Sequence, residues 1–105
     1  MKISWIEMEN NNYIVKGEIE EILPLVSGSG KFGFWLSRSF VLTTKGNYKN
    51  KLFFTCSQEA TRKLISVHVG DLVEVSFYIN SKKNKEHWYP DLLVTDIKLV
   101  SKSKY

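Results

Sequence analysis

The sequence predicts a small all-β barrel of five strands with one short helix between the third and fourth strands. Two observations predict this fold class: apolar and polar residues alternate along five runs, and a helical pattern occurs only once. A third observation bears on function, because residues 22–58 contain no acidic residue but many interleaved basic and aromatic ones. These residues are Lys31, Phe32, Phe34, Trp35, Arg38, Phe40, Lys45, Tyr48, Lys49, Lys51, Phe53 and Phe54.

The first half of the chain predicts three strands. Residues 13–26 form a long first strand whose alternation slips by one position near Glu21, which indicates a bulge. Residues 27–30, Ser-Gly-Ser-Gly, predict a flexible connection. Residues 34–44 are the second strand, and residues 51–57 return as the third strand of a hairpin.

The second strand has two different faces. Its inward side is predicted to carry Phe34, Leu36, Phe40 and Leu42, and its outward side Trp35, Ser37, Ser39, Val41 and Thr43. On the third strand, Phe53 has the same outward orientation, between Lys51 and Thr55. We therefore expect Trp35 and Phe53 to be cross-strand neighbours.

The second half of the chain predicts the helix and two more strands. Ser57 is placed to cap a helix over residues 58–67, whose apolar stripe is Ala60, Leu64 and Val67. Residues 72–80 predict the fourth strand, with Val73, Val75, Phe77 and Ile79 facing the core. Residues 81–87 predict a charged loop, and residues 88–100 predict the fifth strand.

Three strands, a helix and two strands follow the layout of the oligonucleotide/oligosaccharide-binding (OB) fold, a five-stranded Greek-key barrel. Its ligand face comprises strands two and three and the loops joining strands one to two and four to five. The basic and aromatic residues of this chain fall on those elements. The candidate nucleic-acid contacts are Lys31, Trp35, Arg38, Lys49, Lys51, Phe53, Lys82, Lys83, Lys85 and Trp88.

Lysines attract the phosphate backbone whatever the base sequence, and flat rings offer unpaired bases a stacking surface. Trp88 and Tyr89 are strand neighbours and point opposite ways, so we expect Trp88 to face the ligand and Tyr89 to lie in the core. The alternative for each site is structural: a ring can belong to the core and a lysine can be an ordinary solvated residue.

Length and composition indicate one domain. The chain has 105 residues, 43% of them hydrophobic, and a formal net charge of +4. We expect an N-terminal arm over residues 1–12, the barrel over residues 13–100 and a basic tail over residues 101–105. The arm holds apolar side chains that predict docking on the barrel or on another subunit: Ile3, Trp5, Ile6 and Met8.

Other features argue against secretion, membrane insertion and catalysis. The single cysteine, Cys56, fits a reducing compartment, and no signal peptide or membrane span is predicted. His68 and His87 lack acidic or cysteine partners at metal-ligand spacing, so no metal is expected. Glu20 and Glu21 are expected to point to opposite faces of a strand, which is unsuited to paired-carboxylate chemistry. No enzyme activity or cofactor is predicted.

Residues 13–100 resemble a family of small single-domain OB-fold proteins of bacteria and their phages, whose function is unknown. The likeness rests on Gly17-Glu-Ile19, Ile22-Leu-Pro24, Gly28, Trp35, Phe40-Val-Leu42, Gly70-Asp71, Val73-Glu-Val-Ser-Phe77, Ser81, Trp88-Tyr89 and Asp91-Leu92. More loosely, the layout is similar to bacterial and phage single-stranded-DNA-binding proteins.

That likeness implies a protein that coats single-stranded DNA in replication, recombination and repair. We therefore expect a largely sequence-independent single-stranded-DNA-binding protein, a homo-oligomer (dimer or tetramer), in the cytoplasm of a bacterium or a phage-infected host. Two alternatives stay open: an OB-fold module for protein interaction or oligomer formation, and an RNA-binding barrel.

Overall fold

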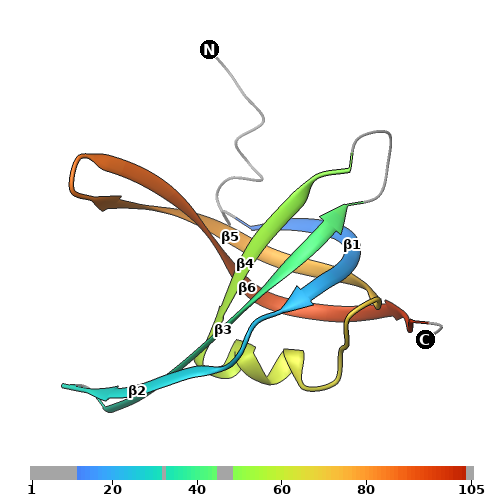
Figure 1. The fold of residues 1–105 in the computed structure, drawn as a ribbon, viewed down its shortest axis with the longest axis horizontal. Helices are drawn as coiled ribbons and strands as arrows, with labels where there is room; N and C mark the ends of the chain where they lie inside the picture. The colour runs from blue at the N-terminus through green and yellow to red at the C-terminus, as the bar shows by residue number, and fades with distance from the viewer. Residues whose placement is uncertain (1–11, 32, 45–48, 104–105) are drawn as a thin grey trace.

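The structure, a computed structural model, describes residues 12–31, 33–44 and 49–103. Its strands are β1 (Tyr13–Ile22), β2 (Val26–Gly30), β3 (Gly33–Thr44), β4 (Lys51–Ser57), β5 (Leu72–Asn84) and β6 (His87–Ser101) (Figure 1). A short 3₁₀ helix, Gln58–Leu64, lies between β4 and β5. The predicted all-β class with one helix at this point of the chain is confirmed.

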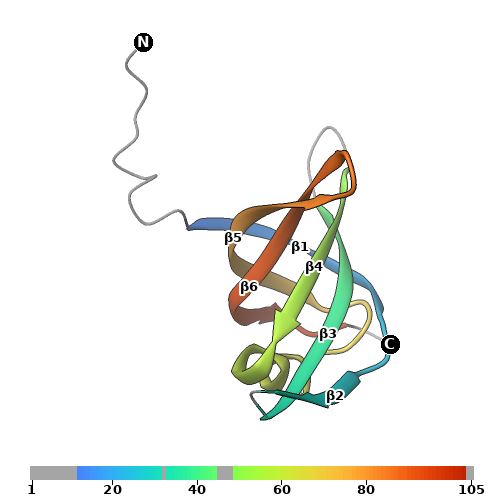
Figure 2. The ribbon, with the colours of Figure 1, turned by 90° about the vertical axis from the view of Figure 1, so that its left-hand side faces the viewer.

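Five of the strands pair in a closed ring. β1 pairs with β5 through its first half and with β3 through its second half, and the ring continues from β5 through β6 and β4 back to β3. The β4–β6 pairing is parallel and short, whereas the other pairings are antiparallel. The ring encloses a barrel, visible when the molecule is turned (Figure 2). The five-stranded barrel is therefore confirmed, and β2 is an additional strand outside it.

β1 can serve two partners because it bends. Gly17 lies opposite Val73 of β5 and Thr44 of β3, so both ladders meet at this residue. A Cβ atom at Gly17 would lie 2.6 Å from the carbonyl oxygen of Thr43, so only glycine allows this close approach. The predicted bulge is also present, because the β1–β3 register shifts between Ile19 and Glu21.

Apolar side chains from every barrel strand fill the interior. The buried set is Ile19, Phe40, Leu42, Phe54, Cys56, Leu64, Val67, Val73, Val75, Phe77, Val94 and Ile97. The Phe54 ring stacks on Phe40 at a centroid distance of 5.3 Å and meets Phe77 edge-on at 5.0 Å. The helix closes one end of the barrel with Leu64. Cys56 is also buried in this core, and its burial raises the pKa of the thiol to about 12.

Several predicted boundaries are wrong. The first strand ends at Ile22, and the expected flexible connection over residues 27–30 belongs to β2, whose backbone pairs with β3. Most of the expected charged loop is strand as well, because Lys82 lies opposite Tyr89 and Lys83 opposite Trp88 in an extended hairpin. The helix is shorter than expected, and its Ser57 makes no side-chain cap.

Two hairpins consequently extend beyond the barrel, both toward the left in Figure 1, one high and one low, and at the top and bottom of Figure 2. We call β2 with residues 33–36 of β3 the short hairpin, and residues 78–90 of β5 and β6 the long hairpin. Phe34 and Ile79 were predicted to face the core, but they lie on these extensions and are 65% and 40% exposed. Alternation places them correctly on the inward side, but no other strand or helix of the described residues covers that side there.

The carboxylate of Asp71 ties the turn before β5 to the chain that follows β6. The backbone N–H of Ser103 donates to its Oδ1 atom at 2.6 Å, and that of His68 donates to its Oδ2 atom at 2.8 Å. These two hydrogen bonds, the Ser103 bond first, lower the pKa of Asp71 even though the side chain is almost fully buried.

A carboxyl whose pKa is lowered by folding adds stability above its unfolded pKa of about 4, and this stability is lost as pH falls through the folded value. We therefore expect Asp71→Asn to be less stable than the wild type at neutral pH. The difference should shrink as pH falls below about 4. Urea unfolding of both proteins across this range measures it, and a difference that stays constant with pH would contradict the assignment.

Candidate nucleic-acid interface

The outward sides of β3 and β4 form one continuous surface, which we call the outer face. β3 contributes Trp35, Ser37, Ser39, Val41 and Thr43, and β4 contributes Lys51, Phe53, Thr55 and Ser57. The strand register aligns Ser37 with Ser57, Ser39 with Thr55 and Val41 with Phe53. The outer face therefore carries an aromatic ring near each end, separated by small polar side chains.

Trp35 lies on the short hairpin and is 43% exposed. Its cross-strand neighbour is Gly28 of β2, and a Cβ atom at Gly28 would lie 2.6 Å from an atom of the indole ring. The indole consequently lies across the β2 backbone. One side of the ring is supported by β2, and the exposed part remains accessible to a base.

Gln58 fixes the backbone on both sides of Trp35. Its Oε1 atom accepts a hydrogen bond from the backbone N–H of Leu36 at 2.7 Å, and its Nε2 atom donates to the carbonyl of Phe34 at 3.5 Å. β4 ends at Ser57, so the Gln58 amide replaces the strand that would otherwise pair with this part of β3. Gln58 itself has a positive φ of 51°, an unusual conformation for a residue with a side chain.

Phe53 is 53% exposed, so both rings of the predicted platform lie outside the core. The expectation that Phe53 and Trp35 are cross-strand neighbours is wrong, because Val41 lies opposite Phe53. Trp35 and Val41 are six positions apart on β3, which is about 20 Å at roughly 3.3 Å per residue. The outer face therefore offers two separate stacking positions.

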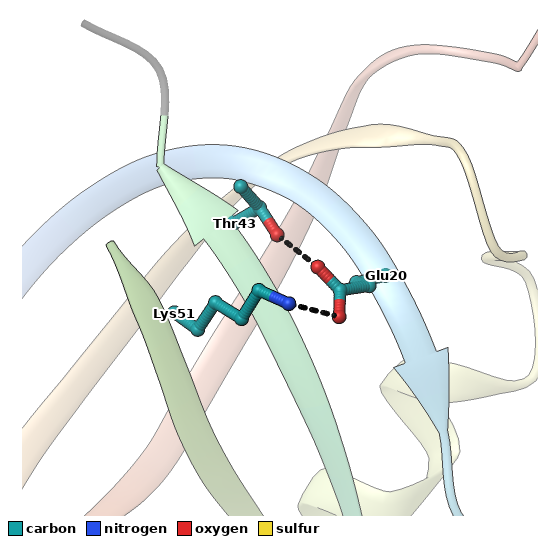
Figure 3. Close-up of polar contacts among 3 residues, drawn as sticks. All are labelled: Glu20, Thr43 and Lys51. Carbon is teal, nitrogen blue, oxygen red and sulfur yellow. Dashed lines mark hydrogen bonds and ion pairs between the residues drawn. The ribbon is translucent and has the colours of Figure 1, made fainter. Parts of the chain in front are cut away.

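Lys51 is engaged by an acidic residue from β1 (Figure 3). Its Nζ atom lies 3.0 Å from Oε2 of Glu20, and the hydroxyl of Thr43 donates to Oε1 of Glu20 at 2.7 Å. These contacts lower the pKa of Glu20, and the hydrogen bond from Thr43 has the largest effect. The three residues line an open groove of about 410 Å³ together with Glu18, Thr44 and Lys49.

The expectation that Glu20 and Glu21 point to opposite faces is wrong. The β1 bulge leaves Glu20 without a partner on β3, while Glu21 lies opposite the outward-facing Val41. Both side chains are exposed, and the Glu20 carboxylate reaches across β3 to Lys51 on β4. The bulge thus places acidic side chains beside a segment that has none of its own.

Arg38 lies on the inward side of β3, not on the outer face. Its Nε atom donates to the carbonyl of Leu23 at 2.8 Å, in a partly buried position at the junction of β1 and β2. Its structural role is therefore to hold the base of the short hairpin. Lys31 lies in the turn at the tip of that hairpin, and Lys49 precedes β4; both are exposed.

The long hairpin places the remaining candidates apart from the barrel. Lys82 pairs with Asp91 at 3.1 Å, and Lys83 Nζ lies 5.8 Å from the centroid of the Trp88 ring. Lys85 occupies the turn with a φ of 59°. The expectation that Tyr89 lies in the core is wrong, because Trp88 and Tyr89 are 65% and 51% exposed.

The alternation of β6 assigns the two rings to different sides of the long hairpin. Leu92 lies opposite the buried Phe54, and Trp88 shares its side, whereas Tyr89 shares the side of Leu93, which lies opposite Thr55 of the outer face. Tyr89 is thus the ring on the side continuous with Phe53. Sequence reasoning missed it because it assigned Trp88 to the ligand side and Tyr89 to the core side, the reverse of the sides that the register indicates.

Some predicted residues lie outside the described part of the chain: Phe32, Lys45, Tyr48 and the whole apolar set of the N-terminal arm. Among the residues that are described, no three His, Cys, Asp or Glu side chains gather in a way that could hold a metal ion. In the same part of the chain, no helix has both the length and the apolar character needed to cross a membrane.

Sequence reasoning also missed Gly28, Glu20 and Gln58 as parts of the site. Aromatic side chains often cover a glycine that lies opposite them on a neighbouring strand. This signal could have found Gly28 only if β2 had been predicted as a strand paired with Trp35. The contacts of Glu20 and Gln58 join residues that are 22 to 31 positions apart. No local pattern reports such contacts.

The closed five-stranded barrel, with its helix between β4 and β5, places the chain in the class of OB-fold proteins. The chain belongs to the family described as Domain of unknown function (DUF3127), which matches residues 14–97. No protein with a curated description matches the sequence.

Solved structures of three other proteins share the fold at low sequence identity. The mitochondrial single-stranded DNA binding protein Rim1 of S. cerevisiae has a TM-score of 0.66 at 16% identity, covering 88% of this chain and 97% of its own. The N-terminal domain of PriB from Thermoanaerobacter tencongensis, a dimeric structure, has a TM-score of 0.64 at 22% identity, covering 89% of this chain and 99% of its own. The small single-stranded DNA-binding protein of Streptomyces coelicolor has a TM-score of 0.55 at 14% identity, covering 85% of this chain and 91% of its own.

We expect Gly28→Ala to move the Trp35 indole off β2, because the added Cβ would overlap the ring. In a background of Trp5→Phe and Trp88→Phe, Trp35 is the single tryptophan, since the chain has three. Its emission should shift to the red and become more accessible to iodide. Ser29→Ala is the matched control, because Ser29 lies opposite Phe34 instead. An unchanged spectrum in Gly28→Ala would contradict the packing described.

Proposed function

We propose that this protein binds single-stranded DNA without catalysis and largely without sequence preference. The observation that carries the proposal is the outer face, where Trp35 and Phe53 remain exposed on a well-packed barrel. Exposed rings give unpaired bases a stacking surface that does not depend on base identity. The likeness of the fold to single-stranded-DNA-binding proteins supports the same reading.

The proposed path runs over the outer face from the short hairpin toward the long hairpin. Its stacking residues are Trp35 and Phe53 on the outer face and Tyr89 on the same side of the long hairpin. Trp88 lies on the other side of that hairpin, so its predicted ligand contact requires the DNA strand to pass around the hairpin. Its proposed phosphate contacts are Lys31, Lys49, Lys51, Lys82, Lys83 and Lys85. Arg38 is omitted, because its guanidinium group already holds the Leu23 carbonyl on the inward side.

The proposed role is to protect or organise single-stranded DNA during replication, recombination or repair. We place it in the cytoplasm of a bacterium or of a phage-infected host, as a homo-oligomer. The dimeric PriB domain, which has the same fold, supports an oligomeric state. Analytical ultracentrifugation of the full chain tests this part of the proposal.

Replacing either ring by alanine should weaken binding of an oligothymidylate by about 1–3 kcal/mol per stacked base. The two losses should add, because about 20 Å of β3 separates the rings and distant sites act independently. Phe34→Ala is the matched control: Phe34 is next to Trp35 and more exposed, but it lies on the other side of β3. Fluorescence anisotropy of a labelled oligothymidylate measures all four proteins and the double variant.

Unchanged affinity in Trp35→Ala and Phe53→Ala, with the fold intact, would refute the stacking role. If wild-type protein bound no oligonucleotide but oligomerised through the same rings, the alternative of a protein-interaction module would replace the proposal. Titration with a matched RNA strand in parallel distinguishes the RNA-binding alternative, since tighter RNA binding would redirect the proposal to RNA.

Affinity should also fall steeply as salt rises, because bound lysines release counterions from the DNA. The logarithmic slope for a single strand is about −0.7 per neutralised phosphate, so Lys83→Ala and Lys85→Ala should each make the slope shallower by roughly that amount. Lys63→Ala is the control, because Lys63 lies on the helix and pairs with Asp96. A flat salt response in the wild type would exclude a phosphate role for these lysines.

A further inference from the structure

The groove between β1, β3 and β4 is an anion site that the chain fills with its own carboxylate. One Glu20 oxygen accepts the Thr43 hydroxyl at 2.7 Å, and the other lies 3.0 Å from Lys51 Nζ (Figure 3). A hydroxyl and an ammonium group placed to hold two oxygens of one anion are also the groups that proteins use to hold phosphate oxygens. The same pair of donors could therefore hold a phosphodiester.

The position of this site suits a nucleic-acid backbone. Lys51 and Phe53 are two residues apart on the outward side of β4, about 7 Å at roughly 3.3 Å per residue. A nucleotide stacked on Phe53 would bring its phosphate within reach of the Lys51 side chain. The groove is open and has a volume of about 410 Å³, so a phosphate can enter it from solvent.

We propose that Thr43 and Lys51 form a phosphate subsite and that Glu20 is its intramolecular competitor, displaced when single-stranded DNA binds. This inference rests on the proposed function and adds a residue, Glu20, that weakens DNA binding. Without displacement, Lys51 is already neutralised and contributes little to phosphate binding.

The exposure of the ion pair makes displacement feasible. The side chains of Lys51 and Glu20 are 67% and 41% exposed, and exposed ion pairs contribute little net stability. A phosphate can replace the carboxylate at Lys51 while water solvates the released Glu20. The carboxylate of Asp71 is a useful contrast, because it is almost fully buried between two backbone N–H groups and has no such freedom.

Glu20→Gln tests the proposal, because glutamine keeps the size of the side chain and an oxygen that accepts from Thr43 but removes the charge. We expect oligothymidylate to bind this variant roughly three- to tenfold more tightly at low salt, since an exposed ion pair no longer has to open and a negative charge is gone. The salt slope should steepen by about 0.7, because in the wild type the displaced Glu20 carboxylate attracts a cation that offsets the one released from the phosphate, and the variant has no such carboxylate.

Glu21→Gln is the matched control. It removes the same charge from the next residue, which is also exposed on β1 but is not the residue that pairs with Lys51. Its salt slope should equal that of the wild type. If both variants changed affinity and slope equally, the effect would be general electrostatics and the competitor role would be refuted.

The Lys51→Ala substitution completes a double-mutant cycle. In the wild-type background it should change affinity less than twofold, because Lys51 loses the Glu20 carboxylate when it gains a phosphate. In the Glu20→Gln background the loss should be severalfold. Equal losses in both backgrounds would overturn the proposal. Reduced thermal stability of Glu20→Gln without any change in binding would also overturn it, because the ion pair would then have a purely structural role.

A second measurement does not depend on DNA binding. Titration with inorganic phosphate, followed by the amide resonances of Thr43 and Lys51, should perturb these resonances at lower phosphate concentration in Glu20→Gln than in the wild type. If this difference appeared but no oligonucleotide bound either protein, the subsite would stand and the proposed function would fail. If oligonucleotide bound normally and this difference were absent, only the competitor role would fail.

Discussion

The double pairing of β1 is the constraint on which the rest of the structure depends. One strand can join β5 and β3 only if it bends, and the bend occurs where Gly17 lets β3 approach and where the bulge shifts the register at Glu20. Closing the ring removes the open edges that a five-stranded sheet would otherwise expose. The same bulge turns Glu20 toward Lys51, so the geometry that closes the barrel also sets the charge of the candidate interface.

The second determinant is the length of β4. Because β4 ends at Ser57, residues 33–36 of β3 leave the barrel and pair only with β2, and the Gln58 side chain continues the hydrogen bonding that β4 no longer provides. The short hairpin therefore carries Trp35 away from Phe53. A ligand that contacts both rings must cross the small polar residues between them, which suits a flexible single strand better than a compact ligand.

The sequence predicted the class of fold and the sides of the strands, because alternation is a local property that the register of β3 and β4 preserves. It did not predict where the barrel ends. Phe34 and Ile79 obey the alternation, yet they lie on hairpins that no other strand or helix among the described residues covers, whereas Tyr89 was predicted on the wrong side of its strand. It also could not place Gly28 beneath Trp35, because that contact depends on the pairing of β2 with β3. Nor could it place Glu20 beside Lys51, because Glu20 lies in a bulge, where the direction of a side chain does not follow the alternation.

The charge distribution shows why the rings matter more than the number of lysines suggests. Lys51 and Lys82, two of the proposed phosphate contacts, already have acidic partners in the folded protein, and the formal net charge is only +4. In the proposed complex, each of these lysines would give up a carboxylate before it gained a phosphate, so its net electrostatic contribution would be smaller than that of a free cation. Trp35 and Phe53 have no comparable cost, since their exposed surfaces are already presented to solvent in the unbound protein. In the proposed complex, base stacking should therefore supply most of the affinity, while Lys51 makes binding responsive to the charge of β1 and Lys82 to that of β6.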